Sequence, residues 1–275
     1  MLTLKNHLSL IDKNNKPLYA IPMEYIKEKI LFALDYIGGV FRLIWESIIA
    51  FPGVFKKPYL ITQQIYFMGF ESLFIVVFTS IFTGMVTAYT AWYQGKSFMP
   101  LVYIGMSVAK AEMIELGPVL TGLVVAGRVS SAIAAEIGTM KVTEQIDALE
   151  ALAINPIQHL VVPRIISGVI ILPILTIVSE VFAVLGGFLL ARFGLGVAAS
   201  VYFRGVRLNY LPITLYGGLL KSLTFGYIIA LMGCYHGLNT KGGAEGVGES
   251  TTRAVVSTMV LLLMFDFIVS RLVFR

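Results

Sequence analysis

Five long apolar runs dominate the hydrophobic pattern of the chain. They occupy residues 66–92, 101–138, 162–191, 211–236 and 253–273. A helix needs about 20 predominantly apolar residues to cross about 30 Å of hydrocarbon. We therefore predict five membrane-spanning helices, of which the second is long enough to tilt or to extend beyond the bilayer.

The segment before these runs has a different periodicity. Its apolar residues recur every three or four positions, at Ile26, Ile30, Leu34, Ile37, Phe41, Ile44 and Ile48. Charged residues lie between them, which predicts an amphipathic helix over 22–50 rather than a span. Such a helix can lie in the membrane interface, with Trp45 at headgroup level, or pair with another helix in a coiled coil. We divide the chain into an extension (1–21), an interfacial or elbow region (22–64) and a five-span domain (65–275).

Composition supports an all-α integral membrane protein. The chain is 57% hydrophobic and 13% charged, with a mean hydropathy of +0.83, whereas soluble domains are about 45–50% apolar and about 25% charged. Eight of the 21 Lys and Arg residues precede the first span. This excess favours a cytoplasmic N-terminus, and five spans then place the C-terminus on the opposite side.

Other classes of protein find little support in the pattern. The basic residues form no patch with interleaved aromatics, which argues against nucleic-acid binding. The one cysteine, Cys234, permits no disulfide framework, and the three histidines are too dispersed to predict a metal site. The first twenty residues lack the apolar core of a signal peptide. No catalytic arrangement stands out, so we expect a chain that is not an enzyme by itself.

Of the ionisable residues inside predicted spans, three draw attention because each lies in an apolar stretch: Glu115, Lys221 and Asp266. Their distances from the outer ends of their helices are about 20, 15 and 10 Å at 1.5 Å per residue, so they can lie at compatible depths. Opposite charges in hydrocarbon are more stable together than apart. The trio is either a polar cluster that takes part in function or a static salt bridge. Pro118 also deprives the Ile114 carbonyl of its helical partner, so the turn beside Glu115 should be weakened.

Small residues recur at every fourth position of the second span, at Gly122, Ala126, Ser130, Ala134 and Gly138. Such a stripe lets another helix approach closely. The neighbour can belong to the same subunit or to a second copy, and a path for lipid along the stripe is a further alternative.

The loop 139–161 contains a short helical pattern between two spans. Thr143 can cap it, Glu144 and Asp147 suit its first turn, and Pro156 follows its end. We expect a short amphipathic helix on the cytoplasmic side, serving as a contact for a motor protein or simply as a surface helix.

The loop 242–252 is rich in glycine but does not fit a nucleotide site. It lacks the Gly-Lys-Ser/Thr ending of a phosphate-binding loop, and no strand precedes it. We expect a tight re-entry turn capped by Ser250 or Thr251.

Several blocks of sequence resemble the MlaE (YrbE) permease family. They are Glu115-Leu116-Gly117-Pro118, Ala126-Gly127-Arg128, residues 135–140, residues 144–149, Asn155-Pro156, residues 243–248 and residues 251–256. The similarity extends from about residue 40 to the C-terminus, with the blocks in family order. One departure is Ile114, which stands where bacterial relatives often have Arg.

The resemblance implies a permease subunit of an ABC transporter in a bacterial inner membrane. Such a subunit moves phospholipid between that membrane and a periplasmic MCE-domain partner, forms a homodimer, and uses ATP bound by a separate ATPase rather than a cofactor of its own. The resemblance places Glu115, Lys221 and Asp266 in the transport cavity. It also assigns ATPase coupling to residues 141–154, with Glu144, Asp147, Leu149 and Glu150 as candidates.

Two rival functions remain compatible with the sequence. One is an ion-coupled secondary transporter that uses Glu115 and Asp266 as proton carriers. The other is a membrane scaffold that anchors an MCE complex.

Overall fold

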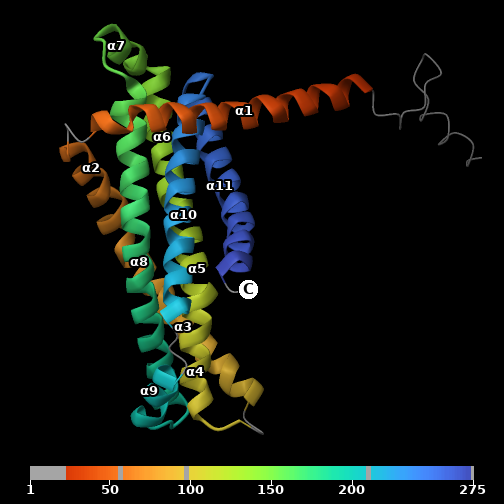
Figure 1. Cartoon of the computed structure of the whole chain (residues 1–275), viewed down its shortest axis with the longest axis vertical. Helices are drawn as coiled ribbons and strands as arrows, with labels where there is room; N and C mark the ends of the chain where they lie inside the picture. The colour runs from red at the N-terminus through yellow and green to blue at the C-terminus, as the bar shows by residue number, and fades with distance from the viewer. Residues whose placement is uncertain (1–22, 55–57, 96–98, 209–211, 274–275) are drawn as a thin grey trace, which may run out of the picture. The chain divides into compact units, whose positions relative to one another are not determined.

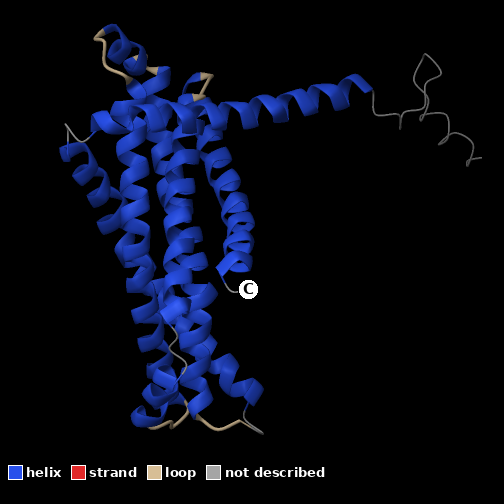
Figure 2. Cartoon of the chain, viewed as in Figure 1, coloured by secondary structure: helices blue, strands red, loops and turns tan. Residues whose placement is uncertain are grey.

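The computed structural model of the chain is helical throughout its regular structure. It describes residues 23–54, 58–95, 99–208 and 212–273, and no strand occurs in these ranges (Figure 2). The chain divides into two compact units, Met1–Trp45 and Glu46–Arg275. The prediction of an all-α integral membrane protein is confirmed, whereas the predicted extension 1–21 lies outside the described residues.

Helix α1 (Met23–Val54) covers the predicted amphipathic segment. Its apolar stripe is largely exposed: more than half of the residue surface is accessible at each of Leu34, Ile37, Phe41 and Trp45. Its residues Leu34–Val54 are also long and apolar enough to cross a membrane. The interfacial position of α1 therefore stays a prediction.

The remaining helices form the second unit. Its α-helices are α2 (Pro58–Ile65), α3 (Glu71–Gly95), α4 (Val102–Ala111), α5 (Gly117–Val125), α6 (Ser131–Val142), α7 (Gln145–Ala151), α8 (Val162–Leu189), α9 (Ala199–Leu208), α10 (Pro212–Leu238) and α11 (Gly243–Val273). Short π-helical turns join several of them into longer rods: η2 (Tyr66–Phe70), η3 (Glu112–Leu116), η4 (Ala126–Ser130), η5 (Ile157–Val161) and η6 (Leu190–Gly194).

Five candidate membrane spans in this unit coincide with the five predicted apolar runs. They are Pro58–Gly95, Val102–Val142, Ile157–Gly194, Pro212–Leu238 and Gly243–Val273. The first, third and fifth begin earlier in the sequence than the apolar runs do, because a helix can continue past the residues that face hydrocarbon.

The glycine-rich segment 242–252 is largely helical and forms the start of α11. The expected re-entry turn over 242–252 is therefore wrong. The chain turns at Gly242 and Gly243, whose backbone φ angles are positive, and α11 already begins at Gly243. Thr251 and Thr252 donate hydrogen bonds to the carbonyl of Gly248, and Glu249 pairs with Arg253 one turn later. These local interactions support a helix that composition alone disfavours.

Glycines set the spacing between the rods. A Cβ on Gly84 of α3 would lie 1.8 Å from the carbonyl oxygen of Ala183 on α8, and one on Gly186 would lie 2.2 Å from that of Ile81. The backbones of α3 and α8 therefore touch, which only glycine permits. Gly105 and Gly205 allow the same close approach between α4 and α9.

The rods differ in how far they extend (Figure 1). Helix α11 packs against α10 and α6, and its C-terminal end lies beside α5, while α4 and α9 continue beyond it. A separate apolar core around Ala88, Val108 and Tyr202 supports that far end. As a result α11 covers only part of the length of the second span.

Candidate functional site

The turn around Glu115 departs from α-helical geometry, as Pro118 leads one to expect. Residues Glu112–Leu116 form the π-helical turn η3, and α5 starts directly after it. Pro118 has no N–H to donate to Ile114. The ammonium of Lys221 on α10 takes that place, with Nζ donating to the Ile114 carbonyl at 2.9 Å.

Lys221 also joins the other two members of the predicted trio. Its Nζ donates to Glu115 Oε2 at 2.6 Å and lies 2.8 Å from Asp266 Oδ1 on α11, as an ion pair without a well-aligned hydrogen bond. Three separate helical segments thus meet at one ammonium group. Its three N–H donors have three acceptors within reach.

Exposure differs sharply among the three side chains. The Lys221 side chain is fully buried, Asp266 is 11% exposed and Glu115 is 46% exposed. The cation is therefore enclosed, while one of its carboxylates opens to the surroundings of the chain. Two carboxylates also exceed one ammonium, so the cluster carries a net charge of −1 when all three groups are ionised. Its role in a transport cavity stays a prediction.

The small-residue stripe packs within the same chain. All five residues are buried, and the neighbours of its glycine and serine residues lie on α10, on α11 and in the short link between them. The Gly122 backbone approaches Phe225 and Leu262, Ser130 Oγ lies 3.0 Å from Thr258 Oγ1, and Gly138 approaches Thr240. Of the alternatives left open by the sequence, the structure favours packing inside one subunit.

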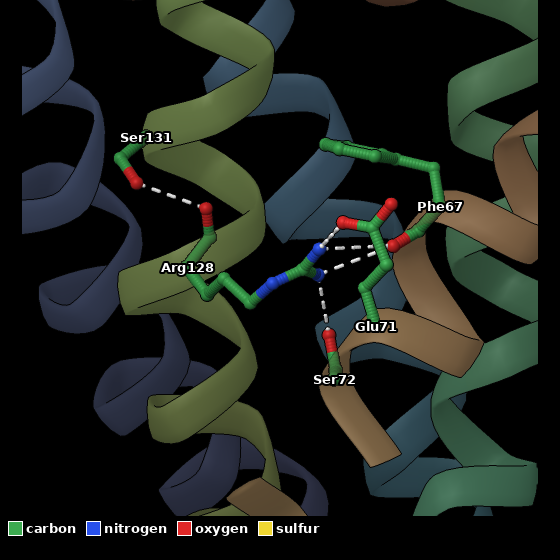
Figure 3. A network of polar contacts seen from close by, with 5 residues as sticks. All are labelled: Phe67, Glu71, Ser72, Arg128 and Ser131. Carbon is green, nitrogen blue, oxygen red and sulfur yellow. Dashed lines mark hydrogen bonds and ion pairs between the residues drawn. The ribbon is translucent and has the colours of Figure 1, made fainter. Parts of the chain in front are cut away.

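A second polar network tethers η4 to the first span (Figure 3). Arg128 donates through Nη1 to Ser72 Oγ at 2.7 Å and through both terminal nitrogens to the Phe67 carbonyl at 3.2 Å. It also pairs with Glu71 and lies over the Phe67 ring. The planar guanidinium thus fastens two π-helical turns, η2 and η4, to each other. The sequence placed Arg128 in a block that resembles the MlaE family, but nothing in it identified the partners.

Sequence reasoning missed two buried carboxyl groups near the trio. Glu112 in η3 is 1% exposed, and Glu180 in α8 is 5% exposed. Both fall within predicted spans, so the signal that singled out Glu115 applied to them equally. Glu112 Oε1 contacts the Thr87 hydroxyl at 3.3 Å, whereas Glu180 Oε1 has no hydrogen-bond partner among the described residues.

The short helix between the second and third spans is present as α7, but Thr143 does not cap it. Thr143 ends α6 and its hydroxyl donates back to the Thr139 carbonyl at 2.8 Å, while Glu144 adopts a left-handed conformation with φ of 60°. The Thr143 hydroxyl binds a carbonyl of the last turn of α6 because the backbone leaves the helical conformation at Glu144, one residue after Thr143.

The candidate coupling residues occupy different faces of α7. Glu144, Asp147 and Glu150 are exposed, and Leu149 is half-buried. Asp147 accepts a hydrogen bond from Lys141 at 2.9 Å. At the end of the helix Leu152 is 72% exposed, which leaves an apolar side chain in the open beside acidic ones.

An ion pair fastens the two rods that flank α7. Arg164 of α8 is 3% exposed and pairs with Glu136 of α6 at 2.7 Å. Its Nη1 also donates to the Leu160 carbonyl at 2.7 Å. The base of the α7 loop is therefore held between fixed helices.

Comparison with known families agrees with this arrangement. The family model described as permease MlaE matches residues 61–272, which include the trio, both polar networks and α7. The chain belongs to the MlaE permease family. The recognised motifs are thus part of a match that spans nearly all of the second unit.

Individual relatives of the MlaE type cover most of the chain. A probable ABC transporter permease protein of Rickettsia typhi is 41% identical over 241 residues, or 86% of this chain and 92% of the relative. One from Synechocystis is 42% identical over 214 residues, covering 78% and 81% respectively. The permease protein MlaE of the intermembrane phospholipid transport system of Haemophilus influenzae is 32% identical over 242 residues, covering 86% and 92%. The chain is thus a multi-pass membrane protein similar to ABC transporter permeases.

Proposed function

We propose that this chain is the permease subunit of an ABC transporter that moves phospholipid between the inner membrane and a periplasmic MCE-domain partner. Membership of the MlaE family supports the permease role, and the name of the Haemophilus relative supports phospholipid as the substrate. Energy comes from ATP hydrolysis in a separate ATPase subunit.

The observation that carries the proposal is the Lys221 cluster. An ammonium buried among spans is costly unless it is paired, and here it is paired with Glu115 and Asp266. The cluster offers a polar surface at Glu115, where each charge has an opposite charge beside it. A phospholipid headgroup can pass such a surface without being held by an isolated charge.

The exposed side of the cluster supports a cavity shared between two copies. Glu115 is nearly half exposed, and α11 presents Leu263, Met264 and Phe267 to its surroundings. A second copy facing this side would enclose a space with apolar walls for acyl chains and a polar patch for the headgroup. The permease therefore acts as a homodimer with its lipid between the subunits.

The ATPase docks through α7 and its flanks. The exposed Glu144, Asp147 and Glu150 provide a polar rim around Leu152, and Leu149 secures the helix. The Arg164–Glu136 pair holds the rods on either side, so a force applied to α7 passes into α6 and α8. In this arrangement the N-terminus and α7 are cytoplasmic, and the C-terminus is periplasmic.

Reconstitution tests the proposal directly. Vesicles holding the chain with its ATPase and MCE partner should transfer labelled phospholipid to an acceptor when ATP is present. Omitting the ATPase, or replacing ATP with a non-hydrolysable analogue, should stop transfer. Lys221→Met should stop transfer while the complex still assembles.

Two results would overturn the proposal. Lipid transfer by the chain alone under a proton gradient would identify an ion-coupled transporter. ATP hydrolysis by the full complex without any lipid transfer would identify a scaffold.

A further inference from the structure

Two buried carboxyl groups lie on neighbouring segments of the helical bundle. Glu112 is in η3 and Glu180 is in α8, and these two segments pack against each other. Among the described residues no third His, Cys, Asp or Glu joins them to form a group that could hold a metal ion. The pair is also separate from the trio, because neither carboxyl group contacts Lys221 in the hydrogen bonds and ion pairs of that cluster.

The packing leaves room for this pair at two glycines. A Cβ on Gly117 would lie 2.9 Å from Glu180 Cγ and 2.7 Å from the Glu112 carbonyl oxygen. A Cβ on Gly218 of α10 would lie 3.5 Å from Glu180 Oε1 and 2.6 Å from the Met113 carbonyl oxygen. The Glu180 side chain therefore fills a space that side chains on α5 and α10 would otherwise occupy.

Glu112 is buried with little hydrogen-bond support, since the Thr87 hydroxyl is its one side-chain partner among the described residues. The Thr87 hydroxyl lies 2.9 Å from the Thr83 carbonyl and 3.3 Å from Glu112 Oε1. A hydroxyl has a single hydrogen, and a carbonyl oxygen can only accept. Thr87 therefore shares one hydrogen between the nearer Thr83 carbonyl and Glu112. Such a weak donor offsets little of the cost of burying a charged carboxylate, and a proton on Glu112 removes that cost.

The surroundings of Glu180 give separate support for a bound proton. Its Oε1 is buried and has no hydrogen-bond partner among the described residues. An ionised carboxylate in such a place costs several kcal/mol. The ammonium group of Lys221 faces Ile114, Glu115 and Asp266, and no ion pair of Glu180 occurs among the described residues. A carboxyl group without a counter-ion is stabilised by holding or sharing a proton.

We propose that Glu112 and Glu180 form a proton-binding site, in which the two carboxyl groups hold an exchangeable proton while α5, α8 and α10 are packed together. The proton comes from water and converts a carboxylate to a carboxylic acid. When the helices separate and water enters, the carboxyl group returns the proton to solvent.

The position of the pair links it to the Lys221 cluster. Glu112 and Glu115 lie three residues apart in η3, and Gly218 lies three residues before Lys221 on α10. Each interval is about one helical turn, or about 5 Å. The other titratable or charged groups around the pair are Tyr202 of α9, which interacts electrostatically with Glu112, and the Lys221 trio. Proton loss from Glu112 would therefore act on the same turn that presents Glu115.

Infrared spectroscopy of the purified full chain in lipid nanodiscs tests the site without relying on transport. At neutral pH the protein should show the C=O stretching band of a protonated carboxyl group. This band should move to lower frequency in D2O and disappear as the pH is raised. It should be absent from the Glu112→Gln/Glu180→Gln double variant, since glutamine preserves side-chain size but cannot hold the proton.

The matched control is Glu249→Gln, which removes an exposed carboxyl group paired with Arg253 and should leave the band unchanged. If the double variant does not accumulate, each single variant should reduce the band. A band that persists in the double variant, does not exchange in D2O, or responds to Na⁺ at constant pH would overturn the proposal.

Thermal stability gives a second readout with a definite sign. Exposed glutamates in the unfolded chain lose their protons well below neutral pH, whereas the folded site retains one. The folded state then binds more protons, so stability falls as pH rises. One retained proton weakens the folding equilibrium by about tenfold per pH unit. The double variant should lack this contribution, and an identical pH slope in both proteins would contradict the site.

Discussion

At the scale of single residues, a carbonyl group without a helical donor and a buried ammonium group form a hydrogen bond with each other. Pro118 leaves the Ile114 carbonyl without a helical donor, and Lys221 supplies one at 2.9 Å. The same ammonium neutralises carboxylates from two further segments. Glu115 is thereby paired with the lysine of a different helix.

Removing the Lys221 charge should separate its structural role from its functional one. Lys221→Met leaves two carboxylates without a counter-ion. Breaking a buried ion pair costs about 3–5 kcal/mol, and we expect the lower end because Glu115 is nearly half exposed. Thermal unfolding in nanodiscs should show this loss. Lys110→Met, which removes an exposed lysine from α4, should have little effect.

Neutralising the partners should then restore stability alone. In the triple variant Lys221→Met/Glu115→Gln/Asp266→Asn no unpaired charge remains, so the unfolding temperature should recover while lipid transfer stays absent. Recovery of both properties would mean that the cluster is only a static salt bridge.

At the scale of helices, close backbone contact decides which rods pack together. Gly84 and Gly186 bring α3 and α8 into contact, and the small-residue stripe does the same for the second span against α10 and α11. In hydrocarbon, such packing replaces the hydrophobic driving force available in water. The ion pairs of Arg128 and Arg164 then fix individual rods relative to their neighbours.

Gly84→Ala should disrupt the contact between α3 and α8. The added methyl group would lie 1.8 Å from a backbone oxygen of Ala183, so the helices must move apart. We expect a marked loss of folded protein in detergent size-exclusion profiles. Gly248→Ala is the control, because nothing lies within 4 Å of its added Cβ. Equal yields of the two variants would show that the close contact is dispensable.

Helix α7 should depend on its exposed leucine for binding the ATPase. Burying a leucine contributes about 1.5–3 kcal/mol, so Leu152→Asp should weaken the affinity for the ATPase subunit by at least about tenfold. Leu208→Asp changes a similarly exposed leucine on α9 and should leave that affinity intact. Equal binding of both variants would place the docking surface elsewhere.

At the scale of the whole molecule, five spans of unequal reach organise the proposed transport path. α11 ends beside α5 while α4 and α9 continue beyond it (Figure 1). The stripe of the second span is covered by α10 and α11, whereas the Glu115 side chain is 46% exposed even though it pairs with Lys221. In the proposed function this exposed side faces lipid or a second copy.

The orientation in the membrane is testable by labelling single cysteines. Cys234 is buried, so the native chain should react little with thiol reagents. With a cytoplasmic N-terminus, Arg207→Cys should react with a membrane-impermeant reagent in cells with a permeabilised outer membrane. Lys241→Cys should react only after lysis. The reverse pattern would invert the orientation.

The sequence by itself determined the membrane class, the isolated charges and five apolar spans, because polar groups are costly in hydrocarbon and are therefore rare along such segments. It did not predict that Leu34–Val54 is also long and apolar enough to span a membrane. The family blocks likewise needed no coordinates. The sequence also predicted that Glu115, Lys221 and Asp266 lie together. It did not determine which residues surround the stripe, which groups Arg128 binds, or that Glu112 and Glu180 lie on segments that pack together. Those facts depend on how helices far apart in the sequence rotate and cross, and the tertiary structure alone decided them. Local hydrogen bonds overrode composition in the same way at Thr143 and along residues 243–252.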